Sequence, residues 1–364
     1  MGAFDGCHSL PVIDNIRYAD TYAVEATDKT LTKYKLREGT RFIGSKVFMG
    51  CTRLESFDIP NTIIDIGRGS FRGCTNLKKV MIPSSVTRID WSAFDSCVSL
   101  KDIVIPDSVT VIWKRAFYGC VNLEHIKMSD SIISLGHEAF NGCESLPIID
   151  GIRYADTCAI EAVDKTLEQY TFVEGTKYIG ESAFFGCKEL KSIEIPDSVT
   201  LIEYKAFGNC KNLQRVKMSD GLKCLPDHCP SMVFGSCNSL PVVNGIRYAD
   251  TWALESTDKD LSEIALRDGT KYIDPWTFHW LLNLRTVTIP ASVKIIGILP
   301  FVFSGAEEIH IRVKDPHSIC INSRYNTNAF DDKVKNKTLH VPIGSGVSYR
   351  NHPFFSKFQE ILEE

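Results

Sequence analysis

Cysteines recur along this chain at a fixed interval, and that interval restricts the possible folds more than any other feature. A spacing of 23 residues separates the successive members of two runs: Cys51, Cys74, Cys97, Cys120 and Cys143, then Cys187 and Cys210. A disulfide framework has no reason to keep a fixed period, whereas a repeat architecture requires one. The 364 residues are therefore predicted to form one repeat array rather than several globular domains.

The repeat unit has a pattern that predicts its local structure. The unit that begins at Cys97 reads CVSLKDIVIPDSVTVIWKRAFYG, and the shared pattern is C-x-x-L-x-x-I-x-I-P-x-x-V-x-x-I-x-x-x-A-F-x-G. Ile103 and Ile105 alternate with period two, which predicts a short strand that the following proline ends. The apolar residues from Val109 to Phe117 have near-helical spacing, which predicts an irregular or one-turn helical return segment.

Stacking of the units is required because one unit cannot bury its own apolar side. Stacked copies bury it continuously and add one parallel strand per unit. The unit starts are Cys7, Cys51, Cys74, Cys97, Cys120, Cys143, Cys187, Cys210, Cys237, Leu281 and Ala306. Because leucine and alanine also occupy the cysteine position, the column is predicted to be a row of small buried apolar side chains. Metal binding and redox pairing of these thiols are the less favoured alternatives.

Three similar insertions interrupt the array, near residues 12–31, 148–167 and 242–261. Each one lengthens the spacing between unit starts from 23 to 44 residues, and each contains the motif I-R-Y-A-D-T. Two-residue hairpin turns are predicted at Asp14-Asn15, Asp150-Gly151 and Asn244-Gly245. A second turn follows near Ala-Asp-Thr, so each insertion is expected to be an antiparallel meander that projects from the solenoid.

The end of the chain departs from the repeat. We therefore expect two parts, a leucine-rich-repeat solenoid over residues 1–338 and a C-terminal cap over residues 339–364. Pro353 suits the first turn of a helix. The apolar face of this cap helix is predicted to consist of Phe354, Phe358, Ile361 and Leu362. Such a helix would cover the last open strand edge.

The I-P-x-x-V-x-x-I-x-x-x-A-F-x-G-C pattern, the G-I-R-Y insertions and the closing L-H-V-P segment resemble the BspA-type leucine-rich repeats over essentially the whole chain. The resemblance implies a bacterial protein that is extracellular or on the cell surface, and a role in adhesion. It carries no catalytic motif and no ligand that could be transferred. The first residues, MGAFDGC, are the end of a repeat without a signal-peptide pattern, so we expect the natural protein to continue upstream.

Composition and motifs argue against several functional classes. The net charge of −4 disfavours a general nucleic-acid binder, and no apolar run reaches the roughly 20 residues of a membrane span. The nine histidines are scattered, and Gly344-Ser345-Gly346 lacks the third glycine of a phosphate loop. Neither enzymatic activity nor a cofactor or metal site is predicted, and a monomer is expected. Cys224 and Cys229 fit no common zinc spacing, which leaves a disulfide between them or free thiols.

The strand residues that flank the inward isoleucines form the first candidate binding surface. Its basic members are Lys78, Lys79, Lys101, Lys127, Lys191, Arg215, Lys217, Arg285 and Arg312. Its acidic members are Glu55, Asp58, Asp102, Glu124 and Glu194. Nine cations against five carboxylates give this face +4, which favours acidic partners such as acidic protein segments or anionic glycans. Simple solvation of the sheet is the alternative.

The insertions supply the second set of candidate contacts. Its members are Tyr18, Tyr154, Tyr248 and Trp252, with Tyr22 and Cys158 at the position equivalent to Trp252. Exposed aromatic side chains would anchor a protein or a sugar. Packing of the meander on the solenoid is the alternative that we favour.

The sequence thus predicts a non-enzymatic module that binds macromolecules through an extended sheet, with a protein or an anionic glycan as partner. Two other functions remain open. One is a structural spacer that displays an upstream domain, and the other is a carbohydrate-binding module that uses the aromatic residues of the insertions.

Overall fold

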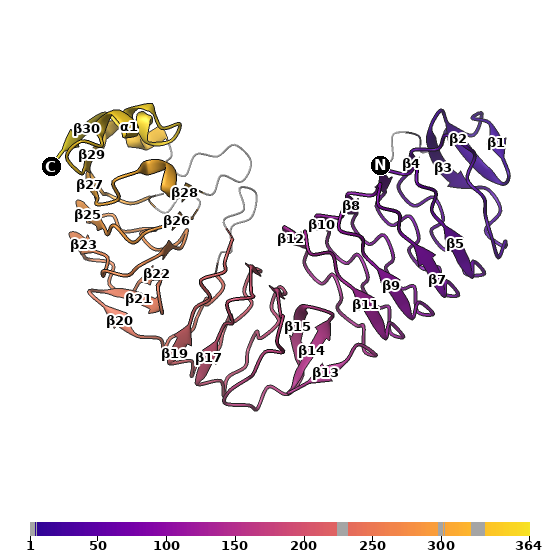
Figure 1. The fold of residues 1–364 in the computed structure, drawn as a ribbon, viewed down its shortest axis with the longest axis horizontal. Coiled ribbons are helices and arrows are strands. Elements are labelled where there is room, and N and C mark those ends of the chain that lie inside the picture. Colours follow the sequence, from indigo (N-terminus) through magenta and orange to yellow (C-terminus); the bar gives the residue numbers. More distant parts are fainter. Residues whose placement is uncertain (1–3, 5, 224–231, 298–300, 302, 322–331) are drawn as a thin grey trace. The chain divides into compact units, whose positions relative to one another are not determined.

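The computed structural model describes residues 4, 6–223, 232–297, 301, 303–321 and 332–364, which form mainly short strands and turns (Figure 1). The chain divides into two compact units. Unit 1 contains Met1–Val163 and Gly175–Glu181, and unit 2 contains Asp164–Glu174 and Ser182–Glu364. Both units are built from the repeat, so the solenoid predicted from the 23-residue spacing is confirmed.

Each regular repeat contributes two short parallel strands, whereas its sequence predicted one. In the repeat that begins at Cys97, β9 (Asp102–Val104) is the predicted strand, and β10 (Val111–Ile112) lies in the return segment. We call the strands of the first kind the first layer and those of the second kind the second layer. Neighbouring repeats pair in register, as Ile103 does with Ile126 and Ile112 with Leu135.

The two layers run through both units. In unit 1 the first layer contains β5 (Ser56–Asp58), β7 (Lys79–Met81), β9 and β11 (His125–Lys127), and the second contains β4 (Phe42–Ile43), β6 (Asp65–Ile66), β8 (Arg88–Ile89), β10, β12 (Ser134–Leu135) and β16 (Tyr178–Ile179). In unit 2 the first layer contains β17 (Ser192–Glu194), β19 (Arg215–Lys217), β23 (Glu263–Ala265), β25 (Thr286–Ile289), β27 (Glu308–Ile311), β29 (Thr338–Val341) and β30 (Glu360–Glu363), and the second contains β18 (Leu201–Ile202), β24 (Tyr272–Ile273), β26 (Ile295–Ile296) and β28 (Cys320–Ile321).

Of the two predicted forms, the return segment takes the irregular one, with a short strand that was not predicted, and it contains no helical turn. Arg115 and Gly119 have φ values of 57° and 67°, and residues with positive φ cannot continue a right-handed helix. Alternate backbone N–H groups of the turn donate to the next repeat, from Arg115 to His137 O at 2.9 Å and from Phe117 to Ala139 O at 2.8 Å. Those between them donate within the turn, as Tyr118 does to Arg115 O at 3.1 Å, so local bonds and bonds between repeats alternate.

Columns of identical side chains fill the space between the two layers. The rings of Phe71, Phe94 and Phe117 are stacked, with centroids 5.3 and 5.4 Å apart, and all three are fully buried. The cysteine column lies beside them and is buried from Cys51 to Cys237, as predicted, whereas Cys7 at its start is exposed. Six of its thiols also donate to the preceding repeat, for example from Cys97 Sγ to Phe71 O at 3.2 Å. This bond fixes the position of the column, and the sequence did not indicate it.

Cys224, Cys229 and Cys320 are further cysteines that do not belong to this column. The predictions for Cys224 and Cys229 fall outside the described residues. Cys320, to which the sequence assigned no role, is disulfide-bonded.

The insertions contain the predicted hairpins. Their strands are β1 (Val12–Ile13), β2 (Ile16–Ala19) and β3 (Tyr22–Ala26), then β13 (Ile148–Ile149), β14 (Ile152–Ala155) and β15 (Cys158–Ala162), then β20 (Val242–Val243), β21 (Ile246–Ala249) and β22 (Trp252–Ser256). Both turn residues have positive φ in every copy, at 49° and 62° for Asp14 and Asn15. The meander does not project from the solenoid, however. Its third strand joins the second layer, since β3 pairs in parallel with β4.

The C-terminal segment differs from its prediction. The described α-helix is α1 (Gly346–Asn351), which ends before Pro353, and the 3-10 helices are η1 (Pro316–Ser318), η3 (Asp332–Asn336) and η4 (Phe355–Lys357). Ile361 and Leu362 lie in β30, which pairs in parallel with β29. An open edge offers unpaired N–H and C=O groups, and β30 satisfies those of β29 as a further strand. The predicted boundary after residue 338 falls within β29, which continues the sheet.

Candidate recognition surfaces

The eight basic residues predicted to contact a partner from the sheet are all exposed. They lie within first-layer strands or directly before them: Lys78, Lys79, Lys101, Lys127, Lys191, Arg215, Lys217 and Arg285. The alternation of inward and outward side chains in a strand accounts for this placement. Their exposure is as predicted, and their role in binding stays a prediction.

Five of these cations have a carboxylate partner in the adjacent repeat. Lys101 Nζ lies 2.9 Å from Glu124 Oε1, and Lys191 Nζ lies 2.5 Å from Glu168 Oε1. The other pairs are Lys78 with Glu55, Lys217 with Glu194, and Arg285 with Glu307. The net charge of +4 predicted for the first-layer face left out Glu168 and Glu307. The face is therefore less basic than expected. Glu307 directly precedes β27, and Glu168 directly precedes Gln169, which bridges to Ser192 of β17. This shared phase could have identified both glutamates.

Three of these eight cations have no carboxylate partner among the described residues: Lys79 on β7, Lys127 on β11 and Arg215 on β19. Arg312, the ninth cation predicted for this face, is exposed directly after β27. Ion pairing raises the pKa of Lys101 and Lys217, through Glu124 and Glu194 respectively. A partner would have to compete with those glutamates for the paired lysines. Lys79, Lys127 and Arg215 can receive an incoming carboxylate without such competition.

Arg215 lies in a hollow of the first-layer face of unit 2. This open groove has a volume of about 630 Å³ and is lined by consecutive repeats, with Gln169, Phe172, Ser192 and Glu194 on its walls. Lys217 also lines it but is paired with Glu194. The groove therefore combines one available cation, polar side chains and an aromatic ring.

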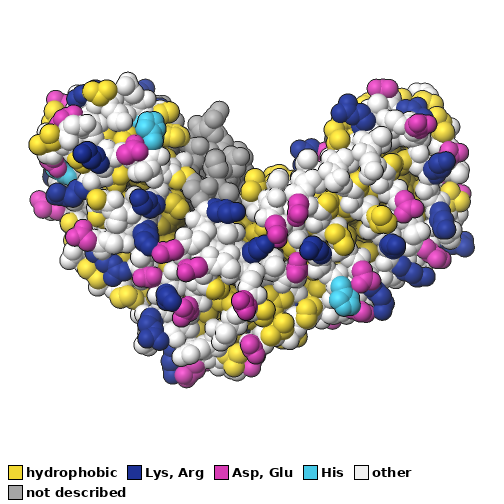
Figure 2. All heavy atoms as spheres, viewed as in Figure 1, with side chains coloured by type: hydrophobic (Ala, Val, Ile, Leu, Met, Phe, Trp, Pro, Cys, Tyr) yellow, Lys and Arg dark blue, Asp and Glu magenta, His cyan; other side chains and the backbone are white. Residues whose placement is uncertain are grey.

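The first-layer face of unit 1 carries two exposed apolar side chains. Met81 and Val104 are 59% and 60% exposed. Met81 is in register with Asp58, and Val104 with Lys127. Figure 2 shows basic, acidic and apolar side chains interspersed on the visible face of each unit, without a large area of one sign. This mixture suits a protein surface better than a uniformly charged polymer.

The aromatic residues of the insertions are buried, which corrects their inclusion among partner contacts. Tyr18, Tyr154, Tyr248 and Trp252 are at most 4% exposed. The hydroxyl of Tyr18 accepts a hydrogen bond from the backbone N–H of Arg37 at 2.9 Å, and that of Tyr248 accepts one from Arg267 at 3.2 Å. Cys158 is also fully buried, whereas Tyr22 is 39% exposed and stacks on Phe42. The favoured packing role is therefore confirmed for the buried members, and Tyr22 is the exception.

Exposed aromatic side chains occur instead in the turns of the repeats, at Trp91 and Trp113 in unit 1 and as a larger cluster in unit 2. The sequence analysis did not single them out. Trp276 and Trp280 are 44% and 55% exposed, and the Trp280 ring stacks on Phe303 with centroids 4.5 Å apart. His279 packs edge-on against Trp276, Trp280 and Phe303. Burial lowers the pKa of His279, so the neutral imidazole is favoured there. These tryptophans replace residues that are small or polar in other units, and that substitution was the available signal.

The sequence model of the BspA type leucine rich repeat region matches six copies of the repeat, over residues 20–147, 163–247 and 230–330. The chain belongs to the BspA-type leucine-rich-repeat family. No curated protein sequence matches it. Within the described ranges, no helix of this family member is long and apolar enough to cross a membrane.

Several solved structures of bacterial leucine-rich-repeat proteins are similar to the chain. The Treponema pallidum protein TpLRR is 23% identical with a TM-score of 0.40, over 56% of this chain and 90% of its own. A protein from Bacteroides ovatus is 24% identical with a TM-score of 0.39, over 97% and 92%. A leucine rich cell surface protein from Faecalibacterium prausnitzii is 24% identical with a TM-score of 0.30, over 85% and 94%.

Proposed function

We propose that this protein is a non-enzymatic binding module of a bacterial surface or secreted protein, and that its first-layer face binds acidic protein partners. The observation that carries the proposal is the difference between paired and unpaired cations on that face. Lys79, Lys127 and Arg215 have no carboxylate partner among the described residues, whereas five other predicted cations do. Membership of the BspA-type family supports the bacterial setting and a role in protein interaction.

The repeat backbone suits this function because it holds the face rigid. First-layer strands pair in register within their sheets, as β5 does with β7, β9 with β11 and β17 with β19. The second layer of unit 1 pairs without a break from β3 to β12. A partner then meets side chains whose positions are already fixed, so less conformational entropy is lost on binding. The exposed Met81 and Val104 add apolar contact next to the cations. Such a surface provides many modest contacts rather than one deep site.

The test compares two charge-reversal variants of the whole chain. The first carries Lys79→Glu, Lys127→Glu and Arg215→Glu. The control carries Arg53→Glu, Lys188→Glu and Lys211→Glu, which reverse three exposed cations in the turns before the strands. Both variants change the net charge equally, so general electrostatic effects cancel. Binding is measured on immobilised poly-L-glutamate, matrix proteins and heparin, at low and at physiological salt.

We expect the wild type and the control to bind acidic protein surfaces, and the first variant to lose at least about 10-fold in affinity. If both variants bind as tightly as the wild type, the unpaired cations of the first-layer face do not bind the partner, and the proposal is wrong. Preference for heparin over every protein would favour the anionic glycan. A wild type that binds nothing would support the structural spacer.

A second candidate function is carbohydrate binding, and the exposed ring cluster of unit 2 is the observation that favours it. Trp280 and Phe303 stack in the turns beside Trp276, and aromatic faces of this kind pack against the apolar sides of sugar rings. The substitution Trp280→Ala should then abolish binding to neutral glycans on an array, while Trp113→Ala in unit 1 should not. Absence of glycan binding by the wild type would exclude this function for the arrayed sugars.

A further inference from the structure

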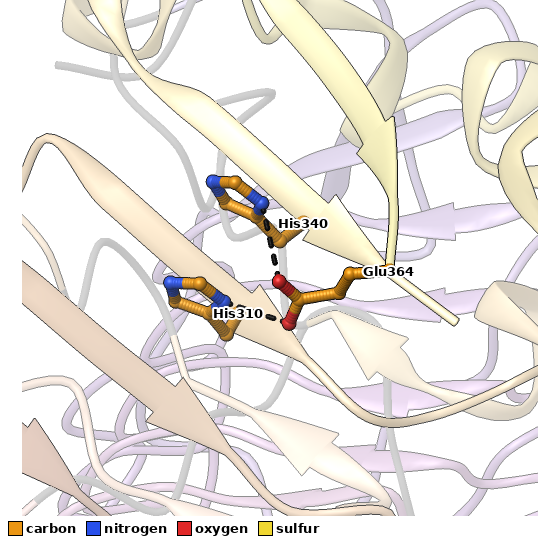
Figure 3. A group of neighbouring side chains, drawn as sticks. All are labelled: His310, His340 and Glu364. Atoms are coloured by element: carbon orange, nitrogen blue, oxygen red, sulfur yellow. Dashed lines mark hydrogen bonds and ion pairs between the residues drawn. The ribbon is translucent and has the colours of Figure 1, made fainter. Parts of the chain in front are cut away.

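Two histidines and a glutamate meet on the last three strands of unit 2, although the sequence analysis predicted no metal site. His310 lies on β27 and pairs in register with His340 on β29. Val341 pairs with Glu363 on β30, and Glu364 directly follows that strand. Figure 3 shows the three side chains converging from these adjacent strands.

The donor atoms are close enough to share one ion. Glu364 Oε1 lies 2.8 Å from His310 Nδ1, and Glu364 Oε2 lies 3.4 Å from His340 Nδ1. One donor atom from each of the three residues lies within 4.8 Å of the others. Ligands of a tetrahedral zinc ion are about 3.3 Å apart, given zinc–nitrogen and zinc–oxygen distances near 2 Å. Small side-chain rotations would therefore complete the site.

A second carboxylate orients one of the histidines. Glu308 Oε2 lies 2.5 Å from Nε2 of His340, the ring nitrogen that faces away from Glu364. Protein metal sites use this arrangement, in which a carboxylate on the far nitrogen fixes the ring and increases the basicity of the ligating nitrogen. The rings of His310 and His340 are also stacked, with centroids 4.2 Å apart, so both are held in place.

The charge around the cluster also suits a cation. Glu308 and Glu364 bring two carboxylates to the two imidazole rings. Imidazole and carboxylate together are the ligand set of zinc and of related transition metals.

We propose that His310, His340 and Glu364 bind one divalent transition-metal ion, with Zn²⁺ as the natural candidate, and that the ion fastens β30 to β27 and β29. Three protein ligands leave a coordination position for water. The ion would link strands that are otherwise joined by backbone pairing at the edge of the sheet. It therefore stabilises the C-terminal end of the solenoid.

The experiment titrates the untagged, metal-depleted protein with Zn²⁺ alone in a calorimeter, after alkylation of the exposed Cys7. We expect one equivalent to bind and the melting temperature to rise on saturation. His340→Gln and Glu364→Gln should each remove this binding, and Glu308→Gln should weaken it roughly 10- to 100-fold. Glu364 is exposed, so its substitution tests the site with little risk to the fold.

The matched control is His125→Gln in unit 1, where a histidine faces a carboxylate of the adjacent strand, Asp102, at 3.0 Å. This pair lacks a second histidine, so its loss should leave zinc affinity unchanged. Absence of saturable binding by the wild type would overturn the proposal. Equal binding by the wild type and by the folded Glu364→Gln variant would also overturn it, because zinc would then bind elsewhere.

Discussion

The stacked phenylalanine column gives the sharpest test of how the repeats hold together, and Phe94→Ala is its most informative substitution. Phe94 is fully buried and stacks on Phe71 and Phe117, with interplanar angles of 3° and 5°. Truncation of a buried phenylalanine costs about 3–5 kcal/mol. Each lost aromatic pair adds about 0.5–1.5 kcal/mol beyond the buried area. Two lost ring pairs add about 1–3 kcal/mol to this cost, so we expect a total loss of about 4–8 kcal/mol.

Urea unfolding of the whole chain measures this loss, followed by circular dichroism and by tryptophan fluorescence. Trp91 and Trp113 lie in the turns beside Phe94 and its neighbour and report on the same repeats. Met81→Ala is the control, because Met81 is 59% exposed and should change the stability by at most about 0.5 kcal/mol. A loss below about 1.5 kcal/mol for Phe94→Ala, with an unchanged slope, would refute the idea that the ring stack couples the repeats.

Three further predictions concern a buried carboxyl group, a turn and the thiols. Burial raises the pKa of Asp274 to about 7, so the folded state keeps a proton that the unfolded chain has lost and its stability falls as pH rises toward 7. Asp274→Asn should thus gain about 3 kcal/mol on the wild type from about pH 5 to about pH 8, and equal pH profiles would contradict this. Gly151→Ala should cost about 1–2 kcal/mol in thermal unfolding because φ is 79°, whereas Asn15→Gly should be neutral. Iodoacetamide followed by mass spectrometry should label Cys7 but not the buried Cys97 before unfolding, and early labelling of Cys97 would contradict its burial.

Local features of the sequence predicted those parts of the fold that depend on residue type and spacing. The 23-residue period predicted the stacking and the register, since each pairing repeats the one before it, as in Ile103 with Ile126. The Asp14-Asn15 turn followed from residues that tolerate positive φ, and both adopt it. The second strand of each repeat was missed. Its apolar spacing resembles one helical turn, and the residues of positive φ, such as Arg115, are not recognisable from their side chains.

The candidate sites depend on contacts between repeats, which explains why sequence reasoning located the charged face but not its pairing. Whether a lysine is neutralised depends on the side chain in the next repeat, so Lys101 has Glu124 whereas Lys127 has no carboxylate among the described residues. The aromatic residues of the insertions were ambiguous for a similar reason. Tyr18 is buried because the third strand of its insertion joins the solenoid.

The repeat period, the inward columns and the hairpin turns were determined by the sequence alone, because each follows from residues within one unit and from its regular recurrence. Tertiary structure alone decided the proximity of His310, His340 and Glu364. These residues lie 30 and 24 positions apart, outside the regular period, and they meet only because β30 replaces the expected helix beside β29. Backbone pairing at an open sheet edge determines that contact, and no pattern of side chains along the chain encodes it.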